Sequence, residues 1–122
     1  MTVVGRSLVI GRPAALLLTR ADATVTLCHR KTPDLAARCR AADILLAAAG
    51  APGLITPECV RPGQIVLDAG ATALPDGTLR GDVTPAAAAI AACTPVPGGI
   101  GSVTTALLLR HTVQAAEKSH HF

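Results

Sequence analysis

The stretch from residue 2 to residue 13, TVVGRSLVIGRP, constrains the fold of this chain more than any other. Its valines favour a β-strand, Gly5 permits a tight turn, and Pro13 suits the first position of a helix. A strand that passes through a glycine turn into a helix N-terminus exposes backbone amides and the positive end of the helix dipole, and both attract phosphate. The stretch therefore predicts a dinucleotide-binding turn. Because Gly5 and Gly11 do not make the usual G-x-G-x-x-G pattern, a plain strand–helix turn remains the alternative.

Strand-like and helix-like segments alternate along the rest of the chain. The expected strands lie at 24–28, 44–49 and 65–70 with a small hairpin at 74–79, and the expected helices lie at 13–20, 32–42, 84–92 and 103–118, with a short one beginning at 56–57. Thr32 and Ser102 are the expected N-caps of two of these helices, and residues 94–101 are expected to form a loop. The alternation predicts an α/β fold, a single three-layer Rossmann-type domain over residues 1–122 with a mostly parallel sheet and helices on both faces.

Composition argues against several classes of partner. The chain has 122 residues, a formal net charge of +3, one Phe and neither Trp nor Tyr. That charge is too small and too scattered to indicate nucleic-acid binding, and no aromatic platform is available on which bases could stack. The apolar runs are too short to span a membrane, and no signal peptide is evident. We therefore expect a soluble, cytoplasmic protein that binds neither nucleic acid nor membrane.

The four cysteines are far apart in the sequence. Cys28, Cys39, Cys59 and Cys93 form no C-x-x-C pair, so neither a zinc site nor a redox pair is expected. Buried free thiols in a reducing compartment are the better interpretation. We also place no metal site at the histidines of positions 120 and 121.

The second expected strand ends in a basic sequence, CHRKT. In doubly wound nucleotide folds a carboxylate at this position binds the ribose 2′-hydroxyl of NAD. Here Arg30 and Lys31 occupy the position, and Arg6 in the first turn could reach the same group. A 2′-phosphate suits such surroundings, which favours NADP over NAD as the cofactor. The alternative is that these charges only solvate the end of a strand.

Two further stretches have the composition of ligand-contacting loops. Ala48, Ala49 and Gly50 follow a central strand, and their small size would let a ring or a ribose lie on the backbone, although simple strand–loop punctuation is the alternative. Residues 94–101, TPVPGGIG, combine fixed prolines with glycines that expose backbone amides. Hydroxyl side chains follow in the next turn, among them that of Thr104. We expect this second loop to contact a ligand.

Five motifs occur in order along the chain: GRSLVIGRP, CHRKT, AAGAPG, GDV and TPVPGGIG. Together they resemble the C-terminal NAD(P)-binding domain of bifunctional methylenetetrahydrofolate dehydrogenase/methenyltetrahydrofolate cyclohydrolase, and the likeness covers nearly the whole chain. The resemblance implies a Rossmann-type domain paired with a folate-binding N-terminal domain, usually in a homodimer. It also implies a role in one-carbon folate metabolism, in which a hydride passes from 5,10-methylenetetrahydrofolate to NADP and the methenyl product is then hydrolysed.

The same resemblance assigns ligand contacts to individual residues. The cofactor-binding residues that it implies are Gly5, Arg6, Ser7 and Gly11 at the pyrophosphate and 2′-phosphate, His29, Arg30 and Thr32 around the adenosine phosphate, and Ala48, Ala49 and Gly50 on the nicotinamide side, together with Gly70 and Thr104. The residues that it implies at the cleft where folate meets the nicotinamide are Pro97, Gly98, Gly99 and Gly101. It assigns no catalytic residue and no metal ligand to this chain.

The chain departs from the family pattern where the chemistry is concerned. The resemblance places a catalytic lysine and a tyrosine in the N-terminal domain, whereas this chain has two lysines, Lys31 and Lys118, outside any matching motif and no tyrosine. Ser102 and Val103 stand where the family tends to have Pro-Met, and Ala71 replaces a larger apolar residue. We therefore expect a truncated or split enzyme whose isolated chain binds NADP but has little or no dehydrogenase or cyclohydrolase activity. The alternative is a stand-alone nucleotide-binding or assembly module without folate chemistry.

The last expected helix carries an apolar face made of Val103, Ala106, Leu107, Leu109 and Val113. If part of that face is exposed, it predicts self-association or a protein partner. We expect a homo-oligomer, and as a further partner a separate folate-binding domain or chain.

Overall fold

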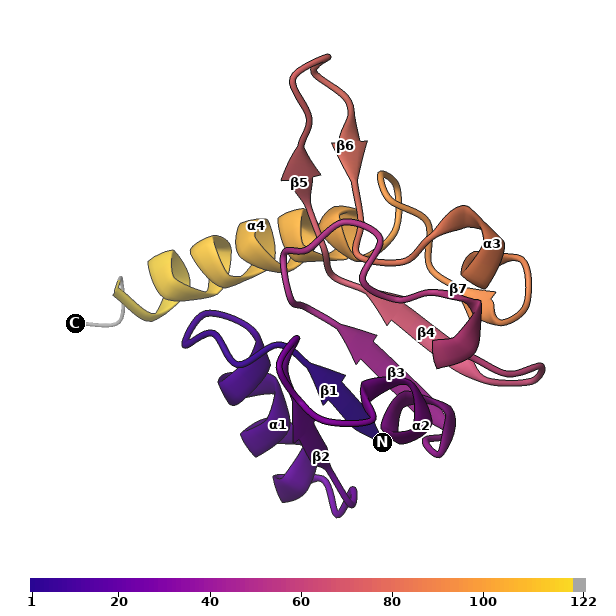
Figure 1. The fold of residues 1–122 in the computed structure, drawn as a ribbon. Coiled ribbons are helices and arrows are strands. Elements are labelled where there is room, and N and C mark those ends of the chain that lie inside the picture. The colour runs from indigo at the N-terminus through magenta and orange to yellow at the C-terminus, as the bar shows by residue number, and fades with distance from the viewer. Residues whose placement is uncertain (120–122) are drawn as a thin grey trace.

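The computed structural model describes residues 1–119, and its centre is a five-stranded parallel sheet in the order β2-β1-β3-β4-β7 (Figure 1). The elements of the sheet and its flanks are β1 (Thr2–Val4), α1 (Gly11–Arg20), β2 (Thr26–Cys28), α2 (Leu35–Arg40), β3 (Ile44–Ala47), the 3₁₀ turn η1 (Pro57–Cys59), β4 (Ile65–Asp68), α3 (Pro85–Ala88), β7 (Ala92–Cys93) and α4 (Ile100–Ser119). The positions considered for a metal at 120 and 121 lie outside the described residues.

Helices cover both faces of this sheet, as the alternation predicts. Side chains of successive strand residues point to opposite faces, so Val3 and Val4 belong to two separate cores. The core around Val3 is covered by α1 and by the start of α4. The core around Val4 is covered by α2, η1 and α3. The three-layer Rossmann-type architecture is therefore confirmed.

The first two helices do not begin where their prolines predict: α1 begins before Pro13, and α2 begins after Pro33. Helix α1 begins at Gly11 rather than Pro13, because the Ser7 hydroxyl oxygen accepts hydrogen bonds from the amides of Ile10 and Gly11, at 3.1 and 3.5 Å. Helix α2 covers only Leu35–Arg40, with Asp34 at its N-cap position in a left-handed conformation (φ 51°). The expectation of an N-cap at Thr32 is wrong, since the Thr32 hydroxyl oxygen instead accepts from the amide of His29.

The alanine-rich segment after residue 84 contains a strand that its helix propensity conceals. Helix α3 ends at Ala88, not near position 92, and β7 follows at Ala92–Cys93. The amides of Ala92 and Thr94 donate to the carbonyls of Gln64 and Val66, which adds β7 to the edge of the sheet. Helix α4 begins at Ile100, so the predicted N-cap at Ser102 is also wrong.

The predicted hairpin is confirmed as the antiparallel pair β5 (Thr72–Ala73) and β6 (Leu79–Arg80), which projects from the body of the molecule (Figure 1). Its turn places Gly77 at φ 81°, and the Asp76 carboxylate accepts hydrogen bonds from the amide and hydroxyl of Thr78. These hydrogen bonds lower the pKa of the Asp76 carboxyl from its ordinary value.

The cysteines are free thiols, as expected, and three of them are buried. Burial raises the pKa of the Cys39 thiol to about 12, and the neighbouring thiols of Cys59 and Cys28 act in the same direction. Burial also raises the pKa of Cys93, with a further contribution from the charge of Asp68.

Among the described residues, no helix has the length and apolarity that crossing a membrane requires.

Candidate functional site

The turn after β1 is a tightly packed cradle that only glycine can form. Gly5 has φ 131°, and a Cβ atom at this position would lie 2.1 Å from the carbonyl oxygen of Ala48. A Cβ atom at Gly11 would lie 2.0 Å from the carbonyl oxygen of Gly5. The turn, the end of β3 and the start of α1 are therefore in backbone contact, which explains both glycines without a G-x-G-x-x-G pattern.

The same turn leaves backbone donors free. Within residues 1–119, the amides of Arg6, Ser7, Leu8 and Val9 donate to no other group, although those of Ile10 and Gly11 are satisfied by the Ser7 hydroxyl. All four of these residues are exposed. Unpaired amides just before a helix N-terminus form a favourable environment for an anion.

A second turn, after β2, presents basic side chains beside the first. Its ends are closed by hydrogen bonds from the His29 amide to the Thr32 hydroxyl oxygen (2.9 Å) and from the Thr32 amide to the His29 carbonyl (2.8 Å). The Lys31 amide donates to Nδ1 of His29 at 3.2 Å. This closure leaves Arg30 and Lys31 exposed at the end of the strand.

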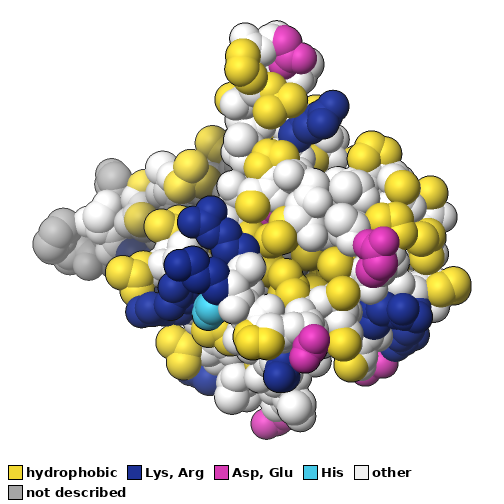
Figure 2. All heavy atoms as spheres, in the orientation of Figure 1, with side chains coloured by type: hydrophobic (Ala, Val, Ile, Leu, Met, Phe, Trp, Pro, Cys, Tyr) yellow, Lys and Arg dark blue, Asp and Glu magenta, His cyan; other side chains and the backbone are white. Residues whose placement is uncertain are grey.

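The two turns and the end of β3 enclose a cavity of about 480 Å³, which we call the basic cavity. Its walls hold three cations and no carboxylate, and Figure 2 shows Lys and Arg side chains gathered around a histidine on this face of the molecule. The residues that line it are Gly5, Arg6, Ser7, His29, Arg30, Lys31, Ala48 and Ala49. The cations, the free amides and the glycine cradle together fit a phosphate-bearing ligand.

A larger cavity of about 770 Å³, the apolar cleft, lies at the same end of the sheet. It is bordered by the β1–α1 loop, by the segment after β4 and by the loop that leads into α4, in which the Val96–Pro97 peptide is cis. Because residues 5–7 line the basic cavity and Val9 and Ile10 line the apolar cleft, one loop borders both. An elongated ligand could therefore extend from one cavity to the other.

The structure divides the predicted site residues among these cavities. Those in the basic cavity are Gly5, Arg6, Ser7, His29, Arg30, Ala48 and Ala49; those in the apolar cleft are Gly70, Pro97, Gly98, Gly99, Gly101 and Thr104; and those in neither are Gly11, Thr32 and Gly50. Gly11 and Thr32 instead shape the two turns. The position of Ala48 and Ala49 beside the arginines differs from the nicotinamide side that the family resemblance implies for them.

Sequence reasoning assigned no role to two buried carboxylates at this end of the sheet, those of Asp68 and Asp82. Each accepts three hydrogen bonds from backbone amides of the loops that border the cavities. The available signal for Asp68 was an acidic residue that ends the apolar run of β4, and the signal for Asp82 was an acidic residue directly after a glycine.

Comparison with known proteins establishes the family. Residues 1–120 match the model of the tetrahydrofolate dehydrogenase/cyclohydrolase, NAD(P)-binding domain. The chain belongs to this family. Bifunctional protein FolD 1 of Rhodococcus jostii (strain RHA1) is 61% identical over 117 residues, which cover 94% of this chain and 39% of the relative. Bifunctional protein FolD of Chloroflexus aurantiacus is 56% identical over 93% of this chain and 40% of its own length.

Solved structures of the same family share the fold. The bifunctional FolD methylenetetrahydrofolate dehydrogenase/cyclohydrolase of Campylobacter jejuni superposes with a TM-score of 0.89 at 41% identity over 97% of this chain and 43% of that one. The Trypanosoma brucei methylenetetrahydrofolate dehydrogenase-cyclohydrolase, in complex with NADP cofactor and an inhibitor, gives a TM-score of 0.89 at 42% identity over 99% and 44%. The chain thus corresponds to the NAD(P)-binding domain of these proteins and spans less than half of their length.

Proposed function

We propose that this chain binds NADP in preference to NAD, as the nucleotide-binding part of a methylenetetrahydrofolate dehydrogenase/cyclohydrolase. The basic cavity carries this proposal, because it brings Arg6, Arg30 and Lys31 together beside free backbone amides. In a doubly wound sheet the ligand lies at the carboxyl ends of the strands, where the strand order reverses. Here β1 lies between β2 and β3 in the sheet, so the basic cavity occupies that point.

The preference for NADP follows from the charges at the end of β2. No carboxylate lines the basic cavity to accept a hydrogen bond from a ribose 2′-hydroxyl, whereas the Arg30 guanidinium can bind a 2′-phosphate through two parallel hydrogen bonds. The four free amides of residues 6–9 are donors for the pyrophosphate. When bound, NADP supplies the acceptor for a hydride, and the residues of this chain bind and orient it.

Folate turnover is the part of the proposal that reaches beyond this chain. We propose that the 122-residue chain alone has little dehydrogenase or cyclohydrolase activity and that both need a folate-binding domain or chain. Proton transfer needs a positioned acid or base, and the only lysines, Lys31 and Lys118, lie in the basic cavity and in the last turn of α4. A folate could meet the nicotinamide in the apolar cleft, which borders the same loop.

A second candidate is a nucleotide-binding assembly module without folate chemistry, and α4 favours it. This helix extends away from the sheet (Figure 1), and none of its residues is buried. Val103, Leu108, Leu109 and Val113 are each more than half exposed. Such a surface supports a homo-oligomer or a protein partner in the cytoplasm.

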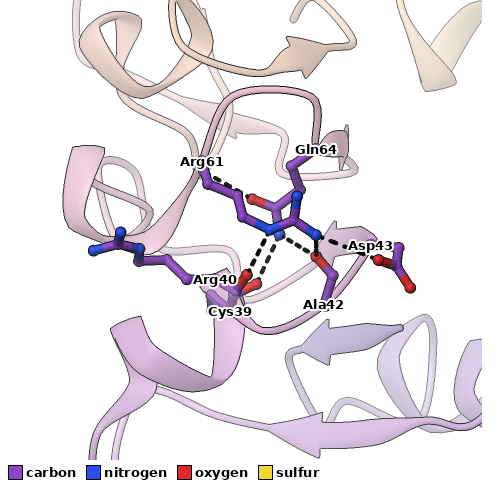
Figure 3. A network of polar contacts seen from close by, with 6 residues as sticks. All are labelled: Cys39, Arg40, Ala42, Asp43, Arg61 and Gln64. Atoms are coloured by element: carbon purple, nitrogen blue, oxygen red, sulfur yellow. Dashed lines mark hydrogen bonds and ion pairs between the residues drawn. The ribbon is translucent and has the colours of Figure 1, made fainter.

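Calorimetric titration of the purified chain with NADP and then with NAD tests the proposal. We expect NADP to bind at least about tenfold more tightly than NAD, the equivalent of one charge-assisted contact. Arg30→Ala should remove this difference by weakening NADP alone. Arg40→Ala is the matched control, since the Arg40 side chain lies at the opposite end of the sheet and points away from its neighbours (Figure 3).

Three results would each count against a different part of the proposal. Failure of both dinucleotides to bind at millimolar concentration would leave the assembly module as the function. Equal affinity for NADP and NAD would retain a dinucleotide site but reject the role of Arg30. Turnover of methylenetetrahydrofolate by the chain alone would refute the need for a folate-binding partner.

A further inference from the structure

The carboxylate of Asp82 holds the backbone that follows β3. Asp82 is fully buried, and its Oδ2 accepts hydrogen bonds from the amides of Ala49 (2.6 Å) and Gly50 (3.1 Å). Its Oδ1 accepts from the amide of Ala51 at 2.7 Å. Three successive amides therefore point toward one side chain that lies more than thirty residues later in the sequence.

Asp82 is itself fixed in place by a second buried carboxylate. The Asp68 side chain accepts from the amide of Gly70 (2.9 Å), from that of Asp82 (3.0 Å) and from that of Val83 (3.0 Å). The Ile55 amide donates to the Asp82 carbonyl at 3.0 Å. The backbone on both sides of Asp82 is thus anchored, so its carboxylate has a defined position from which to act.

Two glycines pack directly against these carboxylates. A Cβ atom at Gly70 would lie 2.7 Å from the carboxyl carbon of Asp82, and one at Gly81 would lie 2.0 Å from Oδ2 of Asp68. Both glycines therefore make room for a carboxylate. For Gly70 this packing is a requirement independent of any contact with a ligand.

The anchored segment forms one wall of the basic cavity. Ala48 and Ala49 line that cavity, and the Ala48 carbonyl packs directly on Gly5 in the turn after β1. If the amides of Ala49 and the next two residues lost their acceptor, they would turn toward water or toward other partners, because it costs free energy to leave an amide unpaired. The wall and its contact with Gly5 would then shift.

We propose that Asp82 is a positioning residue for the dinucleotide, acting through the 49–51 backbone rather than by touching the ligand. The inference rests on the proposed dinucleotide binding and adds a residue outside both the basic cavity and the apolar cleft. Because the wall is common to NADP and NAD, a change at Asp82 should weaken both to a similar extent. This separates its role from that of Arg30, which discriminates between them.

Asp82→Asn is the decisive variant, because it keeps the size of the side chain but replaces one acceptor oxygen with a donor. At least one of the three amides then faces an NH₂ group. We expect the affinity for NADP and for NAD to fall by about tenfold or more, the effect of one lost buried hydrogen bond, with their ratio unchanged. Calorimetry at a temperature where circular dichroism shows full folding gives both affinities.

Gln64→Met is the matched control. Gln64 is as completely buried as Asp82 and also makes three hydrogen bonds to backbone groups, but it lies at the other end of the sheet. The Gln64→Met variant should be less stable than the wild-type chain but should keep the wild-type affinity for NADP. A purely structural role for Asp82 would instead make the two variants behave alike.

Amide hydrogen exchange in the ligand-free protein provides a second measurement. In Asp82→Asn we expect faster exchange at Ala49, Gly50 and Ala51, with unchanged protection in β3 at Leu45 and Leu46. Should Asp82→Asn fail to fold, Asp82→Glu replaces it, since that side chain keeps both oxygens but displaces them by one carbon. The expected effects on exchange and affinity are the same.

The outcomes separate this inference from the function on which it rests. If the wild-type chain binds neither dinucleotide, the proposed function fails and the inference fails with it. If the wild-type chain binds NADP and the Asp82 variant binds within twofold of it, only the inference is overturned. Unchanged exchange at residues 49–51 would also overturn it, whereas weaker binding with local loss of protection supports it.

Discussion

The loops at the two ends of the parallel sheet are fixed by different kinds of side chain, hydrogen-bond acceptors at one end and mainly donors at the other. At the carboxyl end, within residues 1–119, the carboxylates of Asp68 and Asp82 accept hydrogen bonds only from backbone amides. At the amino end, Nε2 of Gln64 donates to the carbonyls of Cys39 (2.7 Å) and Ala42 (2.9 Å), and Nε of Arg61 donates to the carbonyl of Arg40 (3.0 Å) (Figure 3).

The direction of the chain explains this difference. In an α/β fold the chain leaves each strand at the carboxyl end, where helix N-termini and loops have unpaired amides, and it returns from helix C-termini, where carbonyls are unpaired. Carboxylates satisfy the first kind of group, and amide or guanidinium donors satisfy the second. The free amides of the β1–α1 turn thus belong to the end that attracts anions. A phosphate bound there could accept their hydrogen bonds, as the aspartates accept those of the amides beside β3 and β4.

The largest effect that we predict is for Asp68→Ala at the carboxyl end. The substitution leaves the amides of Gly70, Asp82 and Val83 without an acceptor, the first two of them buried, and releases the segment that holds Asp82. We expect the free energy of unfolding to fall by about 3 kcal/mol or more, measured by urea denaturation. A loss below about 1 kcal/mol would mean that water replaces the carboxylate at little cost, and the contrast between the two ends would weaken.

The next effect is for Gln64→Met at the amino end. An apolar side chain of similar length leaves the amide of Arg61 without its acceptor and removes one of the two donors to each of the carbonyls of Cys39 and Ala42. We expect the free energy of unfolding to fall by about 2 kcal/mol, with no change in NADP affinity for the folded protein. A parallel loss of affinity would show that the two ends are energetically coupled and would break the comparison.

A smaller effect is expected from alkaline titration of Cys39, which packs in the core on the α2 side of the sheet. The pKa of this thiol is raised to about 12, so as the pH increases from 9 the unfolded chain releases its proton before the folded chain does. The free energy of unfolding should therefore decline between pH 9 and pH 12. Urea denaturation at pH 8 and pH 10 measures the decline, and Cys39→Ala should reduce it; an equal decline in that variant would contradict the assignment.

The smallest effect is for Asp43→Asn, which removes the ion pair between Arg61 and Asp43. Oδ1 of Asp43 lies 3.3 Å from the Arg61 guanidinium, but the Asp43 side chain is 96% exposed. Solvent screens such a pair, so we expect no measurable change in the denaturation midpoint at 0.15 M salt. A clear shift would mean that the guanidinium needs this carboxylate in order to reach the carbonyls of Arg40 and Ala42.

Local signals in the sequence were sufficient for β1, β2, β3 and β4 and for the chemical character of the site. The valines of β1 and the apolar runs of β3 and β4 predict a parallel sheet, because such runs are typical of its central strands. The β-branched residues that lead into β2 predict a further strand. The basic sequence after β2 also predicts the arginine and lysine side chains of the basic cavity. These features depend on residues that are adjacent in the chain, so they can be read without knowing what packs against them.

Only the tertiary structure decided the features that depend on distant partners. Alanine favours helix, yet Ala92 lies in β7 because the backbone of Gln64 offers it a hydrogen bond. Thr32 precedes a proline like a helix cap, yet its hydroxyl is used by the amide of His29. Asp82 lies in the GDV motif, but the sequence assigns it no role, because only the fold brings the 49–51 amides to it. The sequence thus determined which groups carry charge and which segments are apolar, while packing determined which backbone groups those charges satisfy.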